Sequence, residues 1–240
     1  MNGIESVFFD AGNTLVFLDC DAIAELAAEY GARPDAAALR ELDFGVRHAL
    51  DRGLLARVEG GGEIEQGTVS MGSQDLWSRF FRTLLERAGV APEHSAEIAG
   101  RLRDHDRADP RGLWHRVEED TEAVLAQLRR RGCRLGVISN SDGRLADKLR
   151  EVGLAPYFEV VVDSAAVGVE KPDPRIFHLG LAALGTPAAR SLYVGDIYAV
   201  DVLGARRAGM QAALFDGAGC YQGFEGPVLR RLADLLELVH

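Results

Sequence analysis

Three aspartates stand beside short apolar runs, in places where a buried strand would end. Asp10 directly follows the run Val7–Phe9, Asp196 follows the run "LYVG", and Asp201 comes five residues after Asp196. If these carboxylates meet, they repel one another unless a cation lies between them. Oxygen ligands of this kind suit Mg²⁺, which uses few protein ligands and completes its shell with water and substrate phosphate. The three aspartates therefore predict a magnesium site.

A hydroxyl and an ammonium group complete this set of reactive side chains. Ser139 and Asn140 end another apolar run, and Lys171 lies in a proline-rich loop. The chain has only two lysines, Lys148 and Lys171, among 27 basic residues. Ser139 and its neighbours can hold a phosphate where the next helix begins, and Lys171 can bind a phosphoryl oxygen or a charged nucleophile. The set fits phosphoryl transfer through an aspartyl-phosphate, with Asp10 as the nucleophile.

Alternating strands and helices are expected to hold these side chains in place. The strands are nearly continuous apolar runs, which is typical of a parallel sheet covered by helices on both faces. Ligands of such sheets bind beyond the carboxyl ends of the strands. We therefore predict an α/β fold with a Rossmann-like core. Strands are expected at residues 3–9, 133–139, 158–163, 190–196 and 211–216, and helices at 117–132, 143–154, 173–185, 198–210 and 227–239.

A long helical segment separates the first strand from the rest of this core. Helices are expected at residues 21–30, 35–57, 75–90 and 94–107, and the glycine-rich residues 59–74 are expected to form a mobile loop. We therefore divide the chain into an α/β core, residues 1–17 and 110–240, and an inserted all-helical cap, residues 18–109. The two short connections would act as hinges, so the cap is expected to move as a lid.

The overall composition indicates a globular, cytoplasmic protein. The chain has 240 residues, 47% of them hydrophobic, and a formal net charge of −10. This charge, without a dense basic cluster, argues against a nucleic-acid partner. No apolar run approaches the roughly 20 residues that span a bilayer, and the N-terminus lacks the basic charge of a signal peptide. The three scattered cysteines indicate reduced thiols.

Four stretches of the sequence resemble the motifs of the haloacid dehalogenase superfamily, in the family's order. They are "FFDAGNTL", "LGVISNS", "VGVEKPDPRIF" and "YVGDIYAVDVLGARRAGM". The helical insert after the first motif resembles the C1-type cap of the superfamily's phosphatase and dehalogenase branches. The resemblance implies an Mg²⁺-dependent hydrolase of subfamily IA type that acts on a small phosphorylated metabolite. No motif indicates an oligomeric state.

The resemblance also implies a role for each motif residue. The reaction itself would depend on Asp10, Ser139 and Lys171. The phosphate would be held by Thr14, Ser139, Asn140 and Lys171. The metal would be held by Asp10, the backbone carbonyl of Gly12, Asp196 and Asp201.

Gly12 departs from the pattern of the superfamily's phosphatases, which carry a second aspartate two residues after the nucleophile. The missing side chain normally protonates the leaving group and then activates water, and losing a general acid or base typically costs roughly 10²- to 10⁴-fold in rate. The next residue, Asn13, belongs to the few types that tolerate a left-handed backbone. A residue of the cap could replace the lost acid, and the candidates are Asp19, Asp21, His48, His94 and His105.

The departure at Gly12 leaves two alternatives to an Mg²⁺-dependent phosphatase. One is a metal-independent haloacid dehalogenase-like hydrolase, although the two acids of the fourth motif favour a metal site. The other is a catalytically weak protein with a binding or regulatory role. The Schiff-base chemistry of the phosphonate-cleaving branch needs a cap lysine, and residues 17–109 contain none. The phosphatase therefore stays the preferred interpretation.

Overall fold

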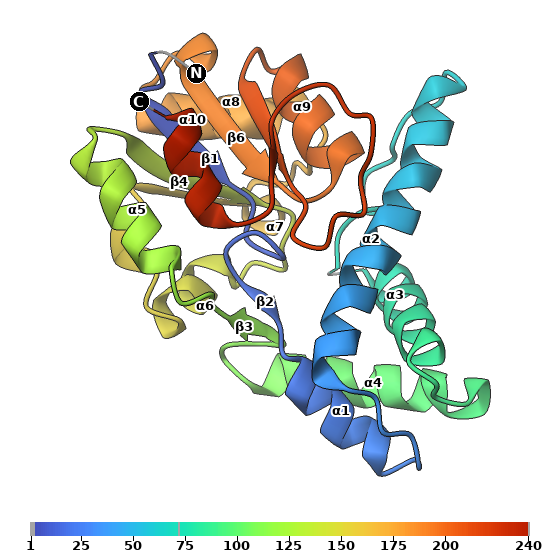
Figure 1. Cartoon of the computed structure of the whole chain (residues 1–240). Helices are drawn as coiled ribbons and strands as arrows, with labels where there is room; N and C mark the ends of the chain where they lie inside the picture. Colours follow the sequence, from blue (N-terminus) through green and yellow to red (C-terminus); the bar gives the residue numbers. More distant parts are fainter. Residues whose placement is uncertain (1–2, 72, 240) are drawn as a thin grey trace.

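A parallel sheet forms the centre of the core in the computed structural model, which describes residues 3–71 and 73–239. Its strands are β1 (Ser6–Phe9), β4 (Arg134–Ser139), β5 (Val160–Asp163), β6 (Ser191–Gly195), β7 (Gln211–Phe215) and β8 (Val228–Leu229). They form one six-stranded sheet in the order β5-β4-β1-β6-β7-β8, and each neighbouring pair is parallel. Helices flank this sheet (Figure 1), which confirms the predicted α/β fold.

Side chains of the central strand alternate between two apolar layers. Val7 and Phe9 of β1 pack into one layer with helix α5 (Thr121–Arg130), and Phe8 packs into the other with helix α8 (Pro174–Leu184). Successive residues of a strand point to opposite faces, so both faces of β1 are buried. Asp10 is thereby placed at the edge of a rigid core. The other core helices are α6 (Leu145–Glu151), α7 (Ser164–Val167), α9 (Leu203–Arg207) and α10 (Leu235–Leu238).

The helical cap lies to one side of the sheet (Figure 1). It contains α1 (Cys20–Ala28), α2 (Ala36–Glu59), α3 (Gln74–Arg87) and α4 (Pro92–Ala108). Ser73 is the N-cap of α3, and its hydroxyl accepts a hydrogen bond from the N–H of Leu76 at 3.1 Å. These helices agree with the periodicity of the sequence and confirm a mostly helical insert after β1. The exact boundaries at residues 18 and 109 stay our interpretation.

A two-stranded ribbon joins the cap to the core. Strand β2 (Phe17–Leu18) pairs in antiparallel fashion with β3 (Trp114–Arg116). The expectation of a wholly helical segment from Phe17 onward is therefore wrong at its first residues. Neither strand could be predicted, because two or three residues show no recognisable period. The two connections of the cap thus lie side by side.

The expected C-terminal helix over residues 227–239 is wrong in its first half. Val228 and Leu229 form β8 and pair with β7. Asp234 then accepts hydrogen bonds from the N–H groups of Arg230 and Arg231, at 2.8 and 2.9 Å, and this closes a turn before α10. A long-range strand pairing has overridden the local helical preference here. The helix expected at 198–210 is also interrupted, because it begins as a π-helical turn, Tyr198–Val202.

Two further properties concern the described residues as a whole. None of their helices combines the length and the apolar composition needed to cross a membrane. Their three cysteines are free thiols: Cys20 and Cys133 are buried, and Cys220 is partly exposed.

Candidate active site

Carboxylates from neighbouring strands meet at the carboxyl edge of the sheet. Asp10 follows β1, Asp196 follows β6, and Asp201 lies in the π-helical turn behind β6. Because β1 and β6 are parallel neighbours, their ends lie side by side. One carboxylate oxygen of each aspartate lies within 4.8 Å of the other two, and all three residues are buried. The structure thus brings together the three acids that the sequence pattern singled out.

Lys171 lies among these acids. Its ammonium donates hydrogen bonds to Asp10 Oδ1 and Asp201 Oδ1, both at 2.7 Å, and to the Tyr193 hydroxyl at 3.0 Å. Burial by itself lowers the pKa of Lys171, but Asp10 and Asp201 outweigh it, so the pKa is raised. The lysine is therefore charged and aimed at the proposed nucleophile.

Asn140 holds the loop that carries Lys171. Its Oδ1 accepts a hydrogen bond from the N–H of Lys171 at 2.8 Å, and its Nδ2 donates to the carbonyl of Lys171 at 3.0 Å. The side-chain amide of Asn140 is therefore committed to positioning the lysine. Any contact of Asn140 with phosphate would have to come from its backbone.

Asp196 is the acid without a hydrogen-bond partner. Both of its carboxylate oxygens are buried, and neither accepts a hydrogen bond from the described residues. The guanidinium of Arg47 lies nearby, with Nη1 at 3.7 Å from Asp196 Oδ2. Burial raises the pKa of Asp196 well above its usual value, and Arg47 offsets only part of this effect. A buried carboxylate without a hydrogen-bond partner is costly. The three acids together offer the oxygen ligands that a hard divalent cation prefers.

A small cavity of about 120 Å³ opens beside Asp10, between the core and the cap. The core contributes the predicted residues Asp10, Gly12, Ser139, Asn140, Lys171 and Asp201 to its wall. The cap contributes Arg47, Met71 and Trp77, and Trp114 of β3 also lines it. Ser139 therefore lies where a phosphate-binding hydroxyl is expected.

Thr14 lies elsewhere. It is not among the residues that line the cavity, and its buried hydroxyl has no hydrogen-bond partner within the described part of the chain. Its expected role in holding phosphate therefore receives no support from the geometry. Thr14 is assigned this role because the sequence resembles the family's first motif, but such a resemblance does not show where a hydroxyl points.

Gly12 has room for a side chain. A Cβ atom placed on Gly12 would meet only Trp114 Cδ1, at 3.8 Å. The left-handed conformation of this turn falls on the next residue, Asn13, whose φ is 55°. The absence of an acid at position 12 is therefore not a steric necessity of the turn.

A buried polar network, which the sequence did not predict, links the cap to this turn. Asp43 of α2 accepts hydrogen bonds from Asn13 Nδ2 at 2.6 Å and from Arg47 Nε at 2.9 Å. Asn13 Oδ1 in turn accepts one from Trp114 Nε1 at 3.2 Å. Asp43 and Arg47 stand four residues apart on a helix, a spacing that usually marks an exposed ion pair. Only the docking of α2 against the core buries them.

Arg47 presents its guanidinium to the cavity. Its Nε is bonded to Asp43, and its Cζ lies 5.2 Å from the ring centre of Phe80 and 5.7 Å from that of Trp114. Burial lowers the pKa of Arg47, but the charges of Asp43 and Asp196 outweigh this, and the pKa is raised. The cap thus supplies a permanent positive charge beside the acids.

The cap residues that were candidates for the missing acid lie away from the cavity. None of the five is among its lining residues in the described chain. Asp19 accepts a hydrogen bond from the N–H of Ala22 and pairs with His115 at 3.1 Å. His48 packs against Tyr221, with ring centres 4.5 Å apart, and His94 against Tyr30, at 5.3 Å. The remaining two candidates, Asp21 and His105, are exposed.

Proteins of known sequence and structure resemble this chain over most of its length. The chain is 38% identical over 161 residues to the phosphoserine phosphatase of Thermus thermophilus, a match that covers 67% of the chain and 62% of that protein. It therefore spans less than two thirds of that relative. It is 32% identical over 211 residues to the glyceraldehyde 3-phosphate phosphatase of Methanopyrus kandleri, covering 86% of the chain and 82% of that protein.

Solved structures and a family model extend this likeness. The HAD-hydrolase YfnB of Bacillus subtilis, solved with bound magnesium, has the same fold, with a TM-score of 0.63, 20% identity and 98% of each chain covered. The model of haloacid dehalogenase-like hydrolases matches residues 4–209. The chain therefore belongs to the haloacid dehalogenase-like hydrolase family.

Proposed function

We propose that the protein is an Mg²⁺-dependent phosphatase that acts on a small phosphorylated metabolite. The observation that supports this most is Asp196, a buried carboxylate without a hydrogen-bond partner in the described chain, close to Asp10 and Asp201. Such a group is best explained by a cation that accompanies it. The two relatives named above are phosphatases of phosphoserine and of glyceraldehyde 3-phosphate, which supports phosphate esters as the substrate class.

Asp10 is the proposed nucleophile. One of its carboxylate oxygens attacks phosphorus, the ester P–O bond breaks, and the electron pair of that bond goes to the leaving oxygen. Lys171, whose ammonium donates a hydrogen bond to Asp10 Oδ1 at 2.7 Å, orients this carboxylate and can bind a phosphoryl oxygen. When bound, Mg²⁺ held by Asp10, Asp196 and Asp201 would neutralise charge on the phosphoryl group.

The second step restores the free enzyme. A water oxygen bonds to the phosphorus of the aspartyl-phosphate, the bond to Asp10 breaks, and the proton of the water passes to solvent. Ser139 and Lys171, which both line the cavity, would hold the phosphoryl group during this step. Inorganic phosphate then leaves, and the carboxylate of Asp10 is regenerated.

Because of Gly12 and Arg47, the reaction rate should depend on how easily the leaving group departs without a proton. Arg47 faces the cavity and can stabilise negative charge, but a guanidinium does not release a proton at neutral pH. With glycine at position 12, no side chain there can protonate a leaving alkoxide. We therefore expect esters with good leaving groups to react faster than alkyl esters, unless breakdown of the aspartyl-phosphate limits both.

The absence of an acid at position 12 favours a second candidate function, that of a haloacid dehalogenase-like hydrolase. A halide leaves as an anion and needs no proton, so a missing general acid costs this reaction nothing. The buried acid pair Asp196 and Asp201 argues for the phosphatase, because a metal-independent reaction does not require it.

One experiment separates these functions. A panel of phosphorylated metabolites and 2-haloacids is assayed with Mg²⁺ and with a chelator, and phosphate and halide release are measured. The phosphatase predicts phosphate release that requires the metal and is lost in Asp10→Asn but kept in Asp147→Asn, a matched change at an exposed acid with 66% side-chain exposure. Halide release that persists in the chelator would overturn the proposal in favour of the dehalogenase.

A further inference from the structure

Both lysines of the chain line the cavity beside Asp10, although the sequence contains only two. Lys171 is committed to Asp10 and Asp201. Lys148, on helix α6, lies on the wall that faces the cap and takes no part in the proposed chemistry. Its position raises the question of what a second ammonium group binds there.

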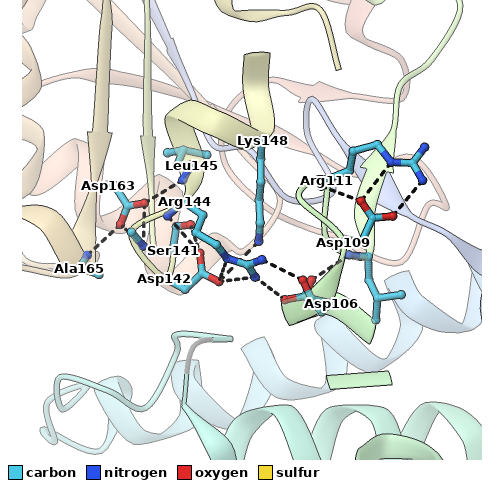
Figure 2. Close-up of polar contacts among 12 residues, drawn as sticks. Asp106, Asp109, Arg111, Ser141, Asp142, Arg144, Leu145, Lys148, Asp163 and Ala165 are labelled. Carbon is cyan, nitrogen blue, oxygen red and sulfur yellow. Dashed lines mark hydrogen bonds and ion pairs between the residues drawn. The ribbon is translucent and has the colours of Figure 1, made fainter. Parts of the chain in front are cut away.

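The acids near Lys148 are already occupied by an arginine. Arg144 donates to Asp142 Oδ2 through Nε at 2.9 Å and through Nη2 at 2.7 Å, and its backbone N–H donates to Asp142 Oδ1 at 3.3 Å. Arg144 also donates to Asp106 Oδ2 at 2.6 Å and to the Asp106 carbonyl at 2.8 Å. The other oxygen of Asp106 accepts from the N–H of Leu113 at 2.8 Å. Both carboxylates are thus supplied with donors (Figure 2).

The ammonium of Lys148 makes one long ion pair and no hydrogen bond within the described chain. Its Nζ forms an ion pair with Asp142 Oδ2 at 3.7 Å, which is beyond hydrogen-bond distance, and no hydrogen bond joins this ammonium to the described residues. The side chain is only 15% exposed, so the group is not simply solvated at the surface. In Figure 2 the side chain of Lys148 extends from α6 toward the same region as Arg144 and Asp106. Three charged N–H donors are therefore available to a ligand in the cavity.

The rest of this part of the cavity suits a short carbon skeleton. Apolar side chains line it, namely Met71, Trp77, Trp114, Leu145 and Leu149. Its volume of about 120 Å³ is well below the roughly 300–1,000 Å³ of pockets that take drug-sized ligands. Beyond a phosphoryl group at Asp10, only a few more atoms can be accommodated. A compact carboxylate suits this space better than a second phosphate.

We infer that the substrate is a phosphorylated short-chain hydroxy acid, whose carboxylate is bound by Lys148 while its phosphoryl group lies at Asp10. The inference rests on the proposed phosphatase function and adds to it the substrate class and a specificity-determining residue. An ammonium group on the substrate would meet Lys148 with like charge, so amino alcohol phosphates are disfavoured. A hydroxyl in place of the carboxylate would leave the Lys148 donors without their anionic partner.

The test compares three esters of nearly equal size: phosphoglycolate, 2-hydroxyethyl phosphate and phosphoethanolamine. They end in a carboxylate, a hydroxyl and an ammonium group. We expect the wild-type enzyme to have the highest kcat/KM on phosphoglycolate. In Lys148→Met, which keeps the length of the side chain without its charge, the ratio of kcat/KM on phosphoglycolate to that on 2-hydroxyethyl phosphate should fall by roughly 10- to 100-fold. Intrinsic differences between the esters cancel in this comparison of ratios.

Two further variants distinguish a binding role from a structural one. Lys148→Arg keeps the charge and should retain most of the preference. Arg150→Met removes a cation from the same helix at a position with 66% side-chain exposure and should leave the ratio unchanged. The loss in Lys148→Met should appear chiefly as a raised KM for phosphoglycolate, with circular dichroism confirming the fold.

The outcomes distinguish a failure of the inference about Lys148 from a failure of the proposed phosphatase function. If esters are hydrolysed but Lys148→Met keeps the wild-type ratio, or if phosphoethanolamine is preferred, the role of Lys148 is wrong and the phosphatase stands. A lost preference in Arg150→Met as well would assign the effect to the helix and contradict the inference. If no ester is hydrolysed while 2-haloacids release halide, the phosphatase and the inference both fail.

Discussion

At the scale of single residues, the proposed phosphatase chemistry is limited most by Gly12. The site holds Lys171 and three carboxylates, of which Asp10 is the proposed nucleophile, yet position 12 offers no proton donor. A side chain is tolerated there, since an added Cβ would contact only Trp114, at 3.8 Å. The cap supplies Arg47, which holds charge but not a transferable proton.

Gly12→Asp should therefore raise activity on alkyl phosphates. The new carboxyl group can protonate the leaving oxygen and then activate water, so we expect kcat/KM on an alkyl phosphate to rise by roughly tenfold or more. The gain on an aryl phosphate should be smaller, because that leaving group needs little protonation. Gly12→Asn, of the same size but without an acid, serves as the control. A folded Gly12→Asp enzyme that does not exceed the wild type on alkyl phosphates would contradict this account.

Asp196 gives a second prediction at this scale, with a readout that does not depend on activity. If Asp196 binds Mg²⁺, the ion stabilises the folded protein by mass action, by about 2.7 kcal/mol at a concentration of 100 times its Kd. Thermal unfolding of the wild type should shift upward with millimolar Mg²⁺, and the shift should disappear in Asp196→Asn. Asp147→Asn should keep it. An equal shift in all three proteins would show that Mg²⁺ binds elsewhere.

At the scale of elements, helix α2 of the cap reaches the loop that carries Asp196 and Asp201. Asp51 of α2 is fully buried and accepts hydrogen bonds from the N–H groups of Tyr198 and Ala199, at 3.0 and 2.8 Å. It also accepts one from the Tyr221 hydroxyl at 2.7 Å. Tyr198 and Ala199 lie between Asp196 and Asp201 in the sequence, so α2 and the acidic loop are positioned together.

The titration of Asp51 makes this contact measurable. Burial, only partly offset by its hydrogen bonds, raises the pKa of Asp51 from 3.8 to about 6. The folded protein therefore holds this proton more tightly than the unfolded chain, and the resulting stabilisation is lost as pH rises from about 4 to about 6. Relative to Asp51→Asn, the free energy of unfolding of the wild type should fall by up to about 3 kcal/mol over this window and then stay level. Denaturant unfolding at several pH values measures it, and parallel curves for the two proteins would contradict it.

At the scale of the whole molecule, the cap is held against the core from two of its helices. Asp51 binds the core from α2, and Asp106 near the end of α4 binds Arg144, whose Nη2 lies 2.6 Å from Asp106 Oδ2. The β2–β3 ribbon is the covalent connection between the two parts. Asp43 of α2 also binds Asn13, and side chains of both parts, such as Phe44 and Phe215, belong to one apolar cluster. We propose that the cap nevertheless moves as a lid about its narrow connection.

If the cap is a lid, removing two of these contacts, those of Asp51 and Arg144, should loosen it without unfolding the molecule. In the double variant Asp51→Asn, Arg144→Met, we expect a larger radius of gyration by small-angle X-ray scattering than in the wild type. Vanadate with Mg²⁺, as a mimic of the bound phosphoryl group, should bring the cap back and reduce the difference. The single variants should lie in between. A double variant that loses stability but keeps the wild-type radius of gyration would indicate a fixed cap.

The α/β core was predictable from the sequence because its signals are local. Apolar runs such as Val7–Phe9 mark strands buried on both faces, and parallel topology places whatever follows them at one edge. For this reason the order of residues along the chain is enough to select Asp10, Ser139, Lys171 and the acid pair after β6. The positive φ of Asn13 was predictable in the same way, from the residue type in a tight turn.

Only the tertiary structure decided which cap residues reach the cavity and which motif residues do not. Arg47, Lys148 and Asp51 look like ordinary surface charges in the sequence, and their burial depends on how α2 and α6 dock against other elements. Thr14 and the histidines of the cap fitted the motif or the chemistry, yet they lie away from the cavity. Strand β8 replaced an expected helix for the same reason. Local composition determines most elements of the core, whereas β8 and the choice of side chains that meet depend on contacts between residues far apart in the chain, which carry no local signal.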